Sequence, residues 1–296
     1  MLMLLPLGSD ERDSRADGRE PRAPRVTLAL LGLNLLVYLA TQGFDLTRAE
    51  ARETELEQVA EWTLRQAGAR APALAARIST PALAFLEHDD RWREEVAGAD
   101  LRERLESVLA DARELRSAHP FHRWGFVPAH ITLPRLIAHQ FLHAGLLHLG
   151  FNMLFLWTVG GLLERTLGPA RFLALYLLGG GAAALVHAAL NRASTEPAVG
   201  ASGAVAAAMG AFAVLHARER MRMALIAAPL LLPRVYFVSW PAWVFLGLWL
   251  LEQIFFVSFG STALGVAFGA HLGGFAFGAL AAVALRQSAA LGQAAG

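Results

Sequence analysis

The sequence predicts an all-α, polytopic membrane protein: a bundle of six transmembrane helices with a soluble helical insert between the first and the second. Composition is the first reason, since 55% of the 296 residues are hydrophobic and the mean hydropathy is +0.41. Charged residues make up 17% of the chain, whereas a soluble protein carries about 25%. The charges are also segregated, because 21 of the 25 acidic residues lie before residue 115. The later part of the chain is therefore too apolar for an ordinary soluble domain.

The start of the chain combines a basic segment with an apolar run. Residues 1–25 carry five arginines and are expected to form a cytoplasmic tail, and the run at 26–43 is predicted to be the first span. A basic flank before an apolar core is also typical of a signal peptide. This core is long for a signal peptide and no small-x-small cleavage site follows it, which favours an uncleaved span.

Residues 44–123 differ in character from the rest of the chain. They hold sixteen of the acidic residues, and Leu101, Leu105, Val108 and Leu109 recur among the charges at helical spacing. The pattern predicts a small soluble helical insert whose charges form a solvated face. Nothing in this segment indicates its function.

From residue 124 onward the apolar stretches are long enough to span a membrane, which takes about 20 helical residues for a hydrocarbon layer of about 30 Å. The segment Met221–Pro233 is also apolar, but Pro229 and Pro233 interrupt it, so an interfacial or re-entrant loop is expected there. The five further spans are predicted near 146–163, 170–191, 201–217, 236–257 and 264–285.

Arginines in the short loops predict the orientation, because short cytoplasmic loops carry an excess of basic residues. With the N-terminus inside, the inner loops hold Arg165, Arg171 and the cluster between 218 and 234, while the short outer loops hold only Arg192 at an edge. Long domains are exempt from this rule. We therefore expect a multi-pass protein of the cell (inner) membrane, with the N-terminus and residues 286–296 in the cytoplasm and the insert outside.

Several residue types are missing, and their absence narrows the chemistry. There is no cysteine, which excludes disulfides, thiolate metal sites and a thiol nucleophile. Residues 124–296 contain no aspartate, which excludes an intramembrane aspartyl pair, and the chain has no His-Glu-x-x-His segment of the kind that binds zinc. The net charge of +1, without a basic patch interleaved with aromatics, gives no indication of nucleic-acid binding. Serine chemistry remains.

Ser202 is the candidate nucleophile. It lies in Gly200-Ala201-Ser202-Gly203 at the start of the predicted fourth span, where small neighbours expose its hydroxyl. A helix N-terminus also offers free N–H groups and a positive dipole end to a developing oxyanion. The alternative interpretation is a helix of small residues that serves packing alone.

His271 in the last span is the candidate general base. Gly274 and Gly278 follow it at a spacing of four, which predicts a flat face for close helix packing. A Ser–His hydrogen bond of about 2.6–3.2 Å requires such an approach. The alternative is a histidine whose ring is hydrogen-bonded to a backbone carbonyl.

A run of polar residues enters the predicted second span: His139, His143, His148 and Asn152. His148 and Asn152 are four residues apart, so both project from one helix face, and both can donate hydrogen bonds to an oxyanion. A metal site is the alternative, although neither cysteine nor an adjacent carboxylate is present. Because no aspartate is available in the spans, a Ser–His dyad is favoured over a triad.

In this order and on separate spans, the motifs resemble those of the rhomboid family of intramembrane serine proteases, in particular its bacterial six-span members. The resemblance covers roughly residues 124–285 and the first span. The matching positions are His143, His148, Asn152, Gly160-Gly161-x-x-Glu164-x3-Gly168, Gly200-x-Ser202-Gly203, Gly210 and Ala270-His271-x2-Gly274-x3-Gly278.

The resemblance implies a rhomboid-like helix bundle with a dyad of Ser202 and His271, oxyanion donors from Asn152, His148 and the Ser202 backbone N–H, and no metal or other cofactor. Supporting roles would fall to Gly200, Gly203, His143, Gly274, Gly278, Glu164 and Arg135. It also implies substrates that are themselves single-span or multi-span membrane proteins, met within the lipid bilayer.

Two positions depart from the family pattern. The family's usual Trp-Arg pair in the first outer loop is Pro134-Arg135 here, and the residue four after the nucleophile, an aromatic in some members, is Ala206. The second departure leaves open what holds the His271 ring.

Two other classes of protein are alternatives to a protease. One is an inactive rhomboid-like protein that binds or chaperones membrane proteins; such members usually lack the serine or the histidine, and this chain has both. The other is a transporter or channel, which would predict an internal repeat that the sequence does not show.

Overall fold

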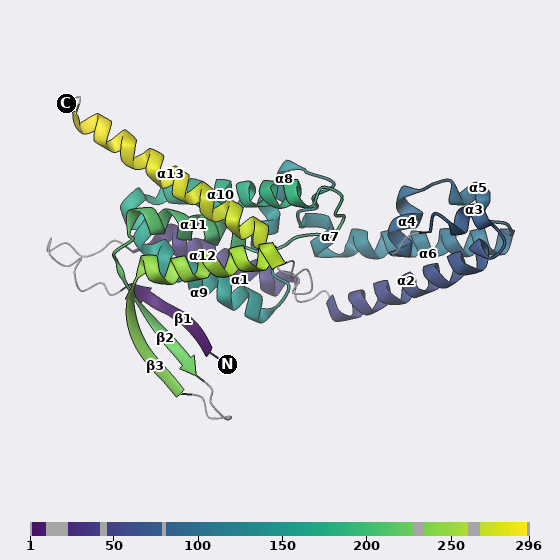
Figure 1. Ribbon diagram of the computed structural model, residues 1–296, viewed down its shortest axis with the longest axis horizontal. Coiled ribbons are helices and arrows are strands. Elements are labelled where there is room, and N and C mark those ends of the chain that lie inside the picture. The colour runs from purple at the N-terminus through teal and green to yellow at the C-terminus, as the bar shows by residue number, and fades with distance from the viewer. Residues whose placement is uncertain are drawn as a thin grey trace. The chain divides into compact units, whose positions relative to one another are not determined.

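The computed structural model divides into two compact units. The first combines Met1–Ala40 with Trp124–Gly296, and the second is Thr41–Arg123. Both consist mainly of helices (Figure 1). The prediction of an all-α chain is wrong in one respect, since the first unit also contains a three-stranded sheet. The described residues are 2–9, 23–41, 46–78, 81–227, 234–259 and 267–294.

The second unit has an apolar core of its own. Its buried Trp92 donates a hydrogen bond from Nε1 to Leu86 O at 3.0 Å, because a buried indole N–H needs an acceptor. The Glu57 carboxylate accepts the first N–H groups of α4, from Ala82 and Leu83, which the helix itself leaves unpaired. The helices are α2 (Leu46–Gly68), α3 (Pro72–Ala75), α4 (Ala82–His88), α5 (Trp92–Glu95), α6 (Ala99–Ala118) and α7 (Pro120–Trp124).

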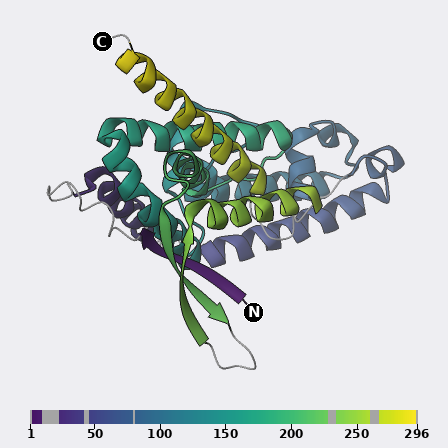
Figure 2. The ribbon, with the colours of Figure 1, turned by 60° about the vertical axis from the view of Figure 1, so that its left-hand side comes forward.

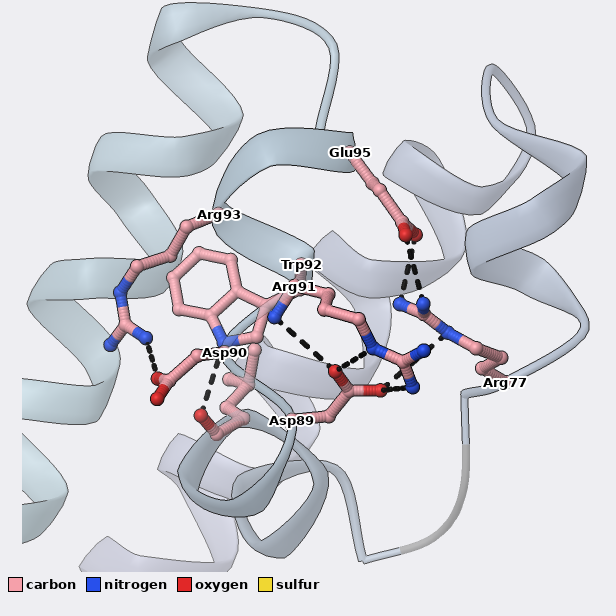
Figure 3. Close-up of polar contacts among 8 residues, drawn as sticks. Arg77, Asp89, Asp90, Arg91, Trp92, Arg93 and Glu95 are labelled. Atoms are coloured by element: carbon pink, nitrogen blue, oxygen red, sulfur yellow. Dashed lines mark hydrogen bonds and ion pairs between the residues drawn. The ribbon is translucent and has the colours of Figure 1, made fainter.

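Charged side chains cross-link the helices of the second unit. Arg77 binds both carboxylate oxygens of Glu95 at 2.8 Å, within the group of ion pairs drawn in Figure 3. Arg116 on α6 joins Glu53 at 2.7 Å and Glu87 at 2.9 Å. Burial disfavours the charge of Arg116, but the hydrogen bond to Glu53 and the charges of both carboxylates outweigh it and raise the pKa of Arg116.

The first unit contains the apolar helices. Among the described residues, three helices are long and apolar enough to cross a membrane, α9, α10 and α13, while the apolar helices α1, α11 and α12 are shorter. A count of six spans therefore stays a prediction. The helices of this unit are α1 (Arg25–Thr41), α8 (Leu133–Ala138), the 3₁₀ turn η2 (His139–Phe141), α9 (Leu146–Leu167), α10 (Pro169–Leu190), α11 (Ser202–Leu215), α12 (Ala242–Phe259) and α13 (Phe268–Ala294).

Local sequence explains where these helices begin and end. Gly168 has a φ of +81°, a conformation that favours glycine, and it ends α9. Pro169 then begins α10, where its missing N–H costs nothing. The last helix continues through the predicted tail at 286–296 as far as Ala294, and the start of its predicted span, 264–266, lies outside the described residues.

The helix α11 lies at the centre of the first unit. Every residue from Gly203 to Phe212 is buried, and most of them are alanine or glycine. Small side chains allow neighbouring backbones to approach closely. Larger side chains, among them Phe172 and Tyr176 of α10, fill the space around it.

The sheet consists of β1 (Leu2–Ser9), β2 (Arg220–Ala227) and β3 (Arg234–Pro241), antiparallel with β2 in the middle. Figure 2 shows the β2–β3 hairpin projecting from the helices with β1 beside it. Met221 and Met223 are buried in the core, whereas the neighbouring side chains Arg220 and Arg222 are exposed.

Three sequence-based predictions change because of the sheet. Residues 2–9, expected in a tail, form a strand, while the arginines at 12–22 lie outside the described residues. Residues 221–227 form β2 and not a loop, and 228–233 lie outside the described part. The predicted span at 236–257 begins as a helix only at Ala242, because 236–241 belong to β3.

Candidate active site

Ser202 is the first residue of α11, and a bend in the backbone precedes it. Gly200 has a φ of +130°, a conformation that side chains other than glycine rarely adopt. Val205 N donates to Ala201 O at 2.9 Å, so the first intrahelical bond comes three residues after Ser202. The N–H groups at 202–204 precede that bond at the positive end of the helix dipole. This arrangement favours a negative charge beside the Ser202 hydroxyl.

The helices α11 and α13 run side by side with their backbones in contact. A Cβ atom on Gly274 would lie 2.2 Å from Gly203 O, and one on Gly278 would lie 1.8 Å from Ala207 O. Only glycine fits at such distances. Gly274 lies against Gly203, and four residues later in each helix Gly278 lies against Ala207. The two helices therefore run parallel, and their N-terminal ends lie at the same end of the bundle.

His271 lies in the first turn of α13, one turn before Gly274, and so at the same end as Ser202. Its Nδ1 atom is 2.7 Å from Oε1 of Gln253 on α12. Ring centroids of Trp249 and Phe268 lie 5.9 Å and 6.2 Å from the His271 ring. Within the described residues no hydrogen bond joins Ser202 and His271. The N-terminal ends of α11 and α13 thus lie at one end of the bundle, but the two side chains are not hydrogen-bonded to each other.

Gln253 is a residue that the sequence analysis missed. Its side chain is 3% exposed and directly follows the exposed Glu252 in the middle of a mostly apolar helix. A polar residue in an apolar span is costly unless it has a partner, and that is the signal that could have singled it out. The partner itself is 18 residues away along the chain and is not predictable from local pattern.

His148 lies in the first turn of α9 and faces the bend before Ser202. A Cβ atom added to Gly200 would lie 2.8 Å from both Cε1 and Nε2 of the His148 ring and 3.8 Å from Ser202 Oγ. The imidazole and the hydroxyl are thus both within 4 Å of this one point. Gly200 is therefore required twice, for its φ angle and for the space that His148 occupies.

Asn152 and His143 complete the polar group around the start of α11. Asn152 is 6% exposed, and its Nδ2 donates one hydrogen bond to His148 O at 2.9 Å, which leaves a second N–H on the same nitrogen. His143 is buried; its Nε2 accepts the Ala201 N–H at 3.4 Å, and its ring centroid lies 5.1 Å from that of His148. His143 thus holds the backbone before Ser202.

The turn η2 braces this backbone from another side. Gly200 N donates to His139 O at 2.9 Å, and the neighbouring Gln140 is docked on α10 through a hydrogen bond to Leu177 O at 3.2 Å. A Cβ atom on Gly180 would lie 2.3 Å from the Gln140 side chain, so α10 has a glycine where Gln140 inserts.

A small cavity of about 30 Å³ lies beside Ser202, lined also by Gly200, His139, His187 and Ala267. A cavity needs about 10–15 Å³ of this kind of volume to hold one water molecule. The two histidines provide the polar partners that a bound water needs. The sequence analysis did not single out His187.

Two of the predicted supporting residues, Glu164 and Arg135, contact other parts of the first unit. Glu164 accepts hydrogen bonds from Val26 N at 2.9 Å and from Thr27 N and Oγ1 at 2.8 and 2.9 Å, and so caps the start of α1. It is sixteen residues after His148 on α9, about 24 Å along the helix axis. Arg135 contributes its backbone oxygen, which lies 2.8 Å from His139 Nδ1.

The metal alternative finds no site in the part of the chain that is described. No group of three or more His, Cys, Asp or Glu side chains there is arranged to hold a metal ion. The histidines that suggested a metal site have other contacts. His139 O and His143 Nε2 accept backbone N–H groups of Gly200 and Ala201, and the His148 ring faces Gly200.

Comparison with known proteins gives one family. A family model described as "Rhomboid domain" matches residues 131–288, more than half of the chain. The chain is 42% identical over 77 residues to the rhomboid protease GluP of Bacillus subtilis, covering 26% of this chain and 15% of that protein. It is 32% identical over 157 residues to the rhomboid protease GlpG of Serratia proteamaculans, covering 52% and 48%.

A third relative is the mitochondrial rhomboid protein 1 of Saccharomyces cerevisiae, 30% identical over 118 residues, covering 36% of this chain and 34% of that protein. The chain therefore spans less than half the length of each of these relatives.

Proposed function

Since this chain belongs to the rhomboid family and is a multi-pass membrane protein, we propose that it is an intramembrane serine endopeptidase with Ser202 as nucleophile and His271 as general base. The family resemblance drawn from the sequence is confirmed; the roles of the individual residues are our proposal. The observation that carries the proposal is the glycine contact between α11 and α13, which places the first turns of the two helices, and thus both side chains, at one end of the bundle.

The proposed reaction begins with attack of Ser202 Oγ on the carbonyl carbon of the scissile peptide, while His271 Nε2 takes the hydroxyl proton. The oxyanion that forms would accept hydrogen bonds from the Ser202 N–H, the Asn152 amide and the His148 ring. His271 then gives its proton to the leaving amine, and an acyl-enzyme on Ser202 remains.

Hydrolysis of the acyl-enzyme repeats these steps with water as the nucleophile. His271 takes a proton from water, the hydroxide adds to the ester carbonyl, and the proton returns to Ser202 Oγ as the new carboxyl group leaves. The cavity lined by His139 and His187 lies beside Ser202 and would hold the water in an otherwise apolar surrounding.

The proposed substrates are transmembrane helices of single-span or multi-span membrane proteins, cut near the outer face of a cell membrane. The apolar helices support this reading, since they would surround Ser202 with lipid and with other helices. We further propose six spans, a cytoplasmic N-terminus and an extracytoplasmic insert, on the evidence of the arginines in the short loops.

The natural absence of cysteine makes the orientation easy to test. In cells, Ser117→Cys in the insert should react with a membrane-impermeant maleimide added from outside, and Arg218→Cys should react only after permeabilisation. Labelling in the reverse order would invert the orientation and place Ser202 near the inner face.

An inactive rhomboid-like protein that binds or chaperones membrane proteins is the second candidate. The adjacent helix ends that carry a serine, a histidine and an amide favour the enzyme, because a binding protein has no need of this combination.

Cleavage of a panel of single-span helices in liposomes tests the proposal. The wild type should cut at least one member of the panel, and Ser202→Ala should cut none. Binding of these helices by both proteins without cleavage by either would favour the chaperone and overturn the protease.

A further inference from the structure

We propose that Gln253 is the positioning residue of the general base: its amide oxygen holds His271 in one orientation and one tautomer, as a carboxylate does in a catalytic triad. The inference rests on the proposed function, because His271 needs a fixed orientation only if it acts as a base.

The contact itself determines the tautomer. Nδ1 of His271 and Oε1 of Gln253 are 2.7 Å apart, a short hydrogen bond. An amide oxygen can only accept, so Nδ1 must carry the hydrogen. In a neutral imidazole this leaves Nε2 unprotonated, which is the form that can take the proton of Ser202 Oγ.

Two rings fix the plane of the imidazole. Trp249 lies one turn before Gln253 on α12, so both side chains project from the same helix face. The Trp249 ring is tilted by 34° to the His271 ring, and Phe268 meets it edge-on at 82°. The helix α12 thus supplies both the acceptor and a ring that limits rotation.

The same arrangement explains why no aromatic residue is present four positions after Ser202. That position is Ala206, and its Cβ would be 3.3 Å from a Cβ on Gly274. The close contact of α11 and α13 leaves no room there for an aromatic ring. Trp249 and Gln253 of α12 contact the His271 ring instead.

An amide also suits this location better than a carboxylate. Gln253 is almost fully buried, and an ionised carboxylate there would carry a large desolvation cost whenever His271 is neutral. Of the four acidic residues beyond 124, Glu164 caps α1, Glu196 and Glu252 are exposed, and Glu219 follows the C-terminal end of α11, the end opposite Ser202. When His271 becomes an imidazolium, the hydrogen bond to Gln253 remains and strengthens, because its donor is then charged.

Three variants separate this role from packing. Gln253→Met keeps the length of the side chain and removes the acceptor, Gln253→Glu keeps both length and acceptor, and Glu252→Gln changes the exposed neighbour on the same helix. For each, kcat and KM on a transmembrane substrate in liposomes, the rate of Ser202 labelling by a fluorophosphonate, and the thermal unfolding temperature are measured.

We expect Gln253→Met to lower kcat and the labelling rate by about 10- to 100-fold, the effect of losing one hydrogen bond to a charged group. KM and the unfolding temperature should stay near the wild-type values. Gln253→Glu, which restores an acceptor, should recover part of the lost rate at a lower unfolding temperature, because a buried carboxylate is costly. Glu252→Gln should match the wild type.

Undiminished kcat in Gln253→Met, with Ser202→Ala inactive, would overturn the inference and leave the protease intact. Equal losses of kcat in the Met and Glu variants, with the Met variant also unfolding at a lower temperature than the wild type, would assign Gln253 a packing role and also overturn the inference. A wild-type protein that neither cleaves the substrate nor reacts with the fluorophosphonate would remove the proposed function, and this inference with it.

Discussion

The helices of the charged unit at 41–123 and those of the apolar unit that carries Ser202 are held together by different interactions. In the charged unit, large side chains such as Trp92 fill the core, and ion pairs such as Arg116 with Glu53 connect the helices outside it. In the apolar unit, alanine and glycine bring helices into backbone contact, as at Gly278 and Ala207. A spanning helix gains little from burying apolar side chains, since lipid is as apolar as they are, so closeness of approach decides the packing.

This difference also determines where chemistry can take place. In the charged unit a polar group can be satisfied by water, so an ion pair there has few consequences. In the apolar unit a buried polar side chain is costly unless the protein supplies a partner, and the partners of His143 and His271 hold them near Ser202. We therefore expect substitutions in the two units to differ in kind, with losses of activity in one and losses of local stability in the other.

The largest expected effect compares one serine from each unit. Ser202→Ala should reduce kcat by about 10⁶-fold, as removal of the nucleophile does in other serine enzymes, with little change in unfolding temperature. Ser117→Ala, at an exposed position on α6, should leave kcat unchanged. Both are measured by cleavage of a transmembrane substrate in liposomes. Near-normal turnover in Ser202→Ala would show that another group is the nucleophile.

The second comparison uses two buried asparagines, each of which donates to the carbonyl four residues earlier on its own helix. Asn152→Ala should lower kcat by about 10²–10³-fold, because one donor to the oxyanion is worth about 3–4 kcal/mol. Asn34→Ala on α1 removes the same local bond and should change stability without changing kcat. Equal effects of both variants on kcat would mean that Asn152 acts through the fold.

The third comparison tests the contact between α11 and α13. Gly278→Ala would place a Cβ 1.8 Å from Ala207 O and should destabilise the bundle by about 1–3 kcal/mol, as overpacking does, while also lowering kcat. The matched control is Gly247→Ala on α12, where a Cβ would meet nothing within 4 Å. Thermal unfolding in detergent and the cleavage rate are the measurements. A Gly278→Ala protein with normal stability would contradict the close approach.

The smallest effect is expected in the charged unit. Arg116→Gln breaks the ion pairs with Glu53 and Glu87 and should cost about 1 kcal/mol or less, because these side chains are partly exposed to solvent. Hydrogen exchange of α2 and α6 in the full-length protein should become faster, and kcat should not change. A large loss of kcat would give this unit a part in catalysis that nothing in its own structure indicates.

Local sequence pattern is enough to predict several of the helices. Apolar runs of sufficient length predicted α9, α10 and α13, because helix length must match the thickness of the membrane. The glycines around Ser202 and after His271 indicated close packing before any contact was known. The order of these motifs was enough to identify the family, which the match over 131–288 confirmed.

One local signal was present and misread. The alternation Arg220-Met221-Arg222-Met223 has the period of two that is typical of a strand, and the structure buries the methionines and exposes the arginines. The prolines that follow made the segment resemble a loop. Its pairing with Leu2–Ser9 joins residues more than 200 positions apart and has no local signature at all.

Contacts between side chains of different helices could not be predicted from local pattern. Glu164, taken for part of the site, caps α1, while Gln253, whose partner no local pattern indicates, lies 2.7 Å from His271. The physical reason is that periodicity reports which face of a helix is polar or small, whereas partners are set by how the helices pack. In an apolar surrounding a buried polar group without a partner is costly, and His271 has its partner on α12 because the packing brings that helix within reach.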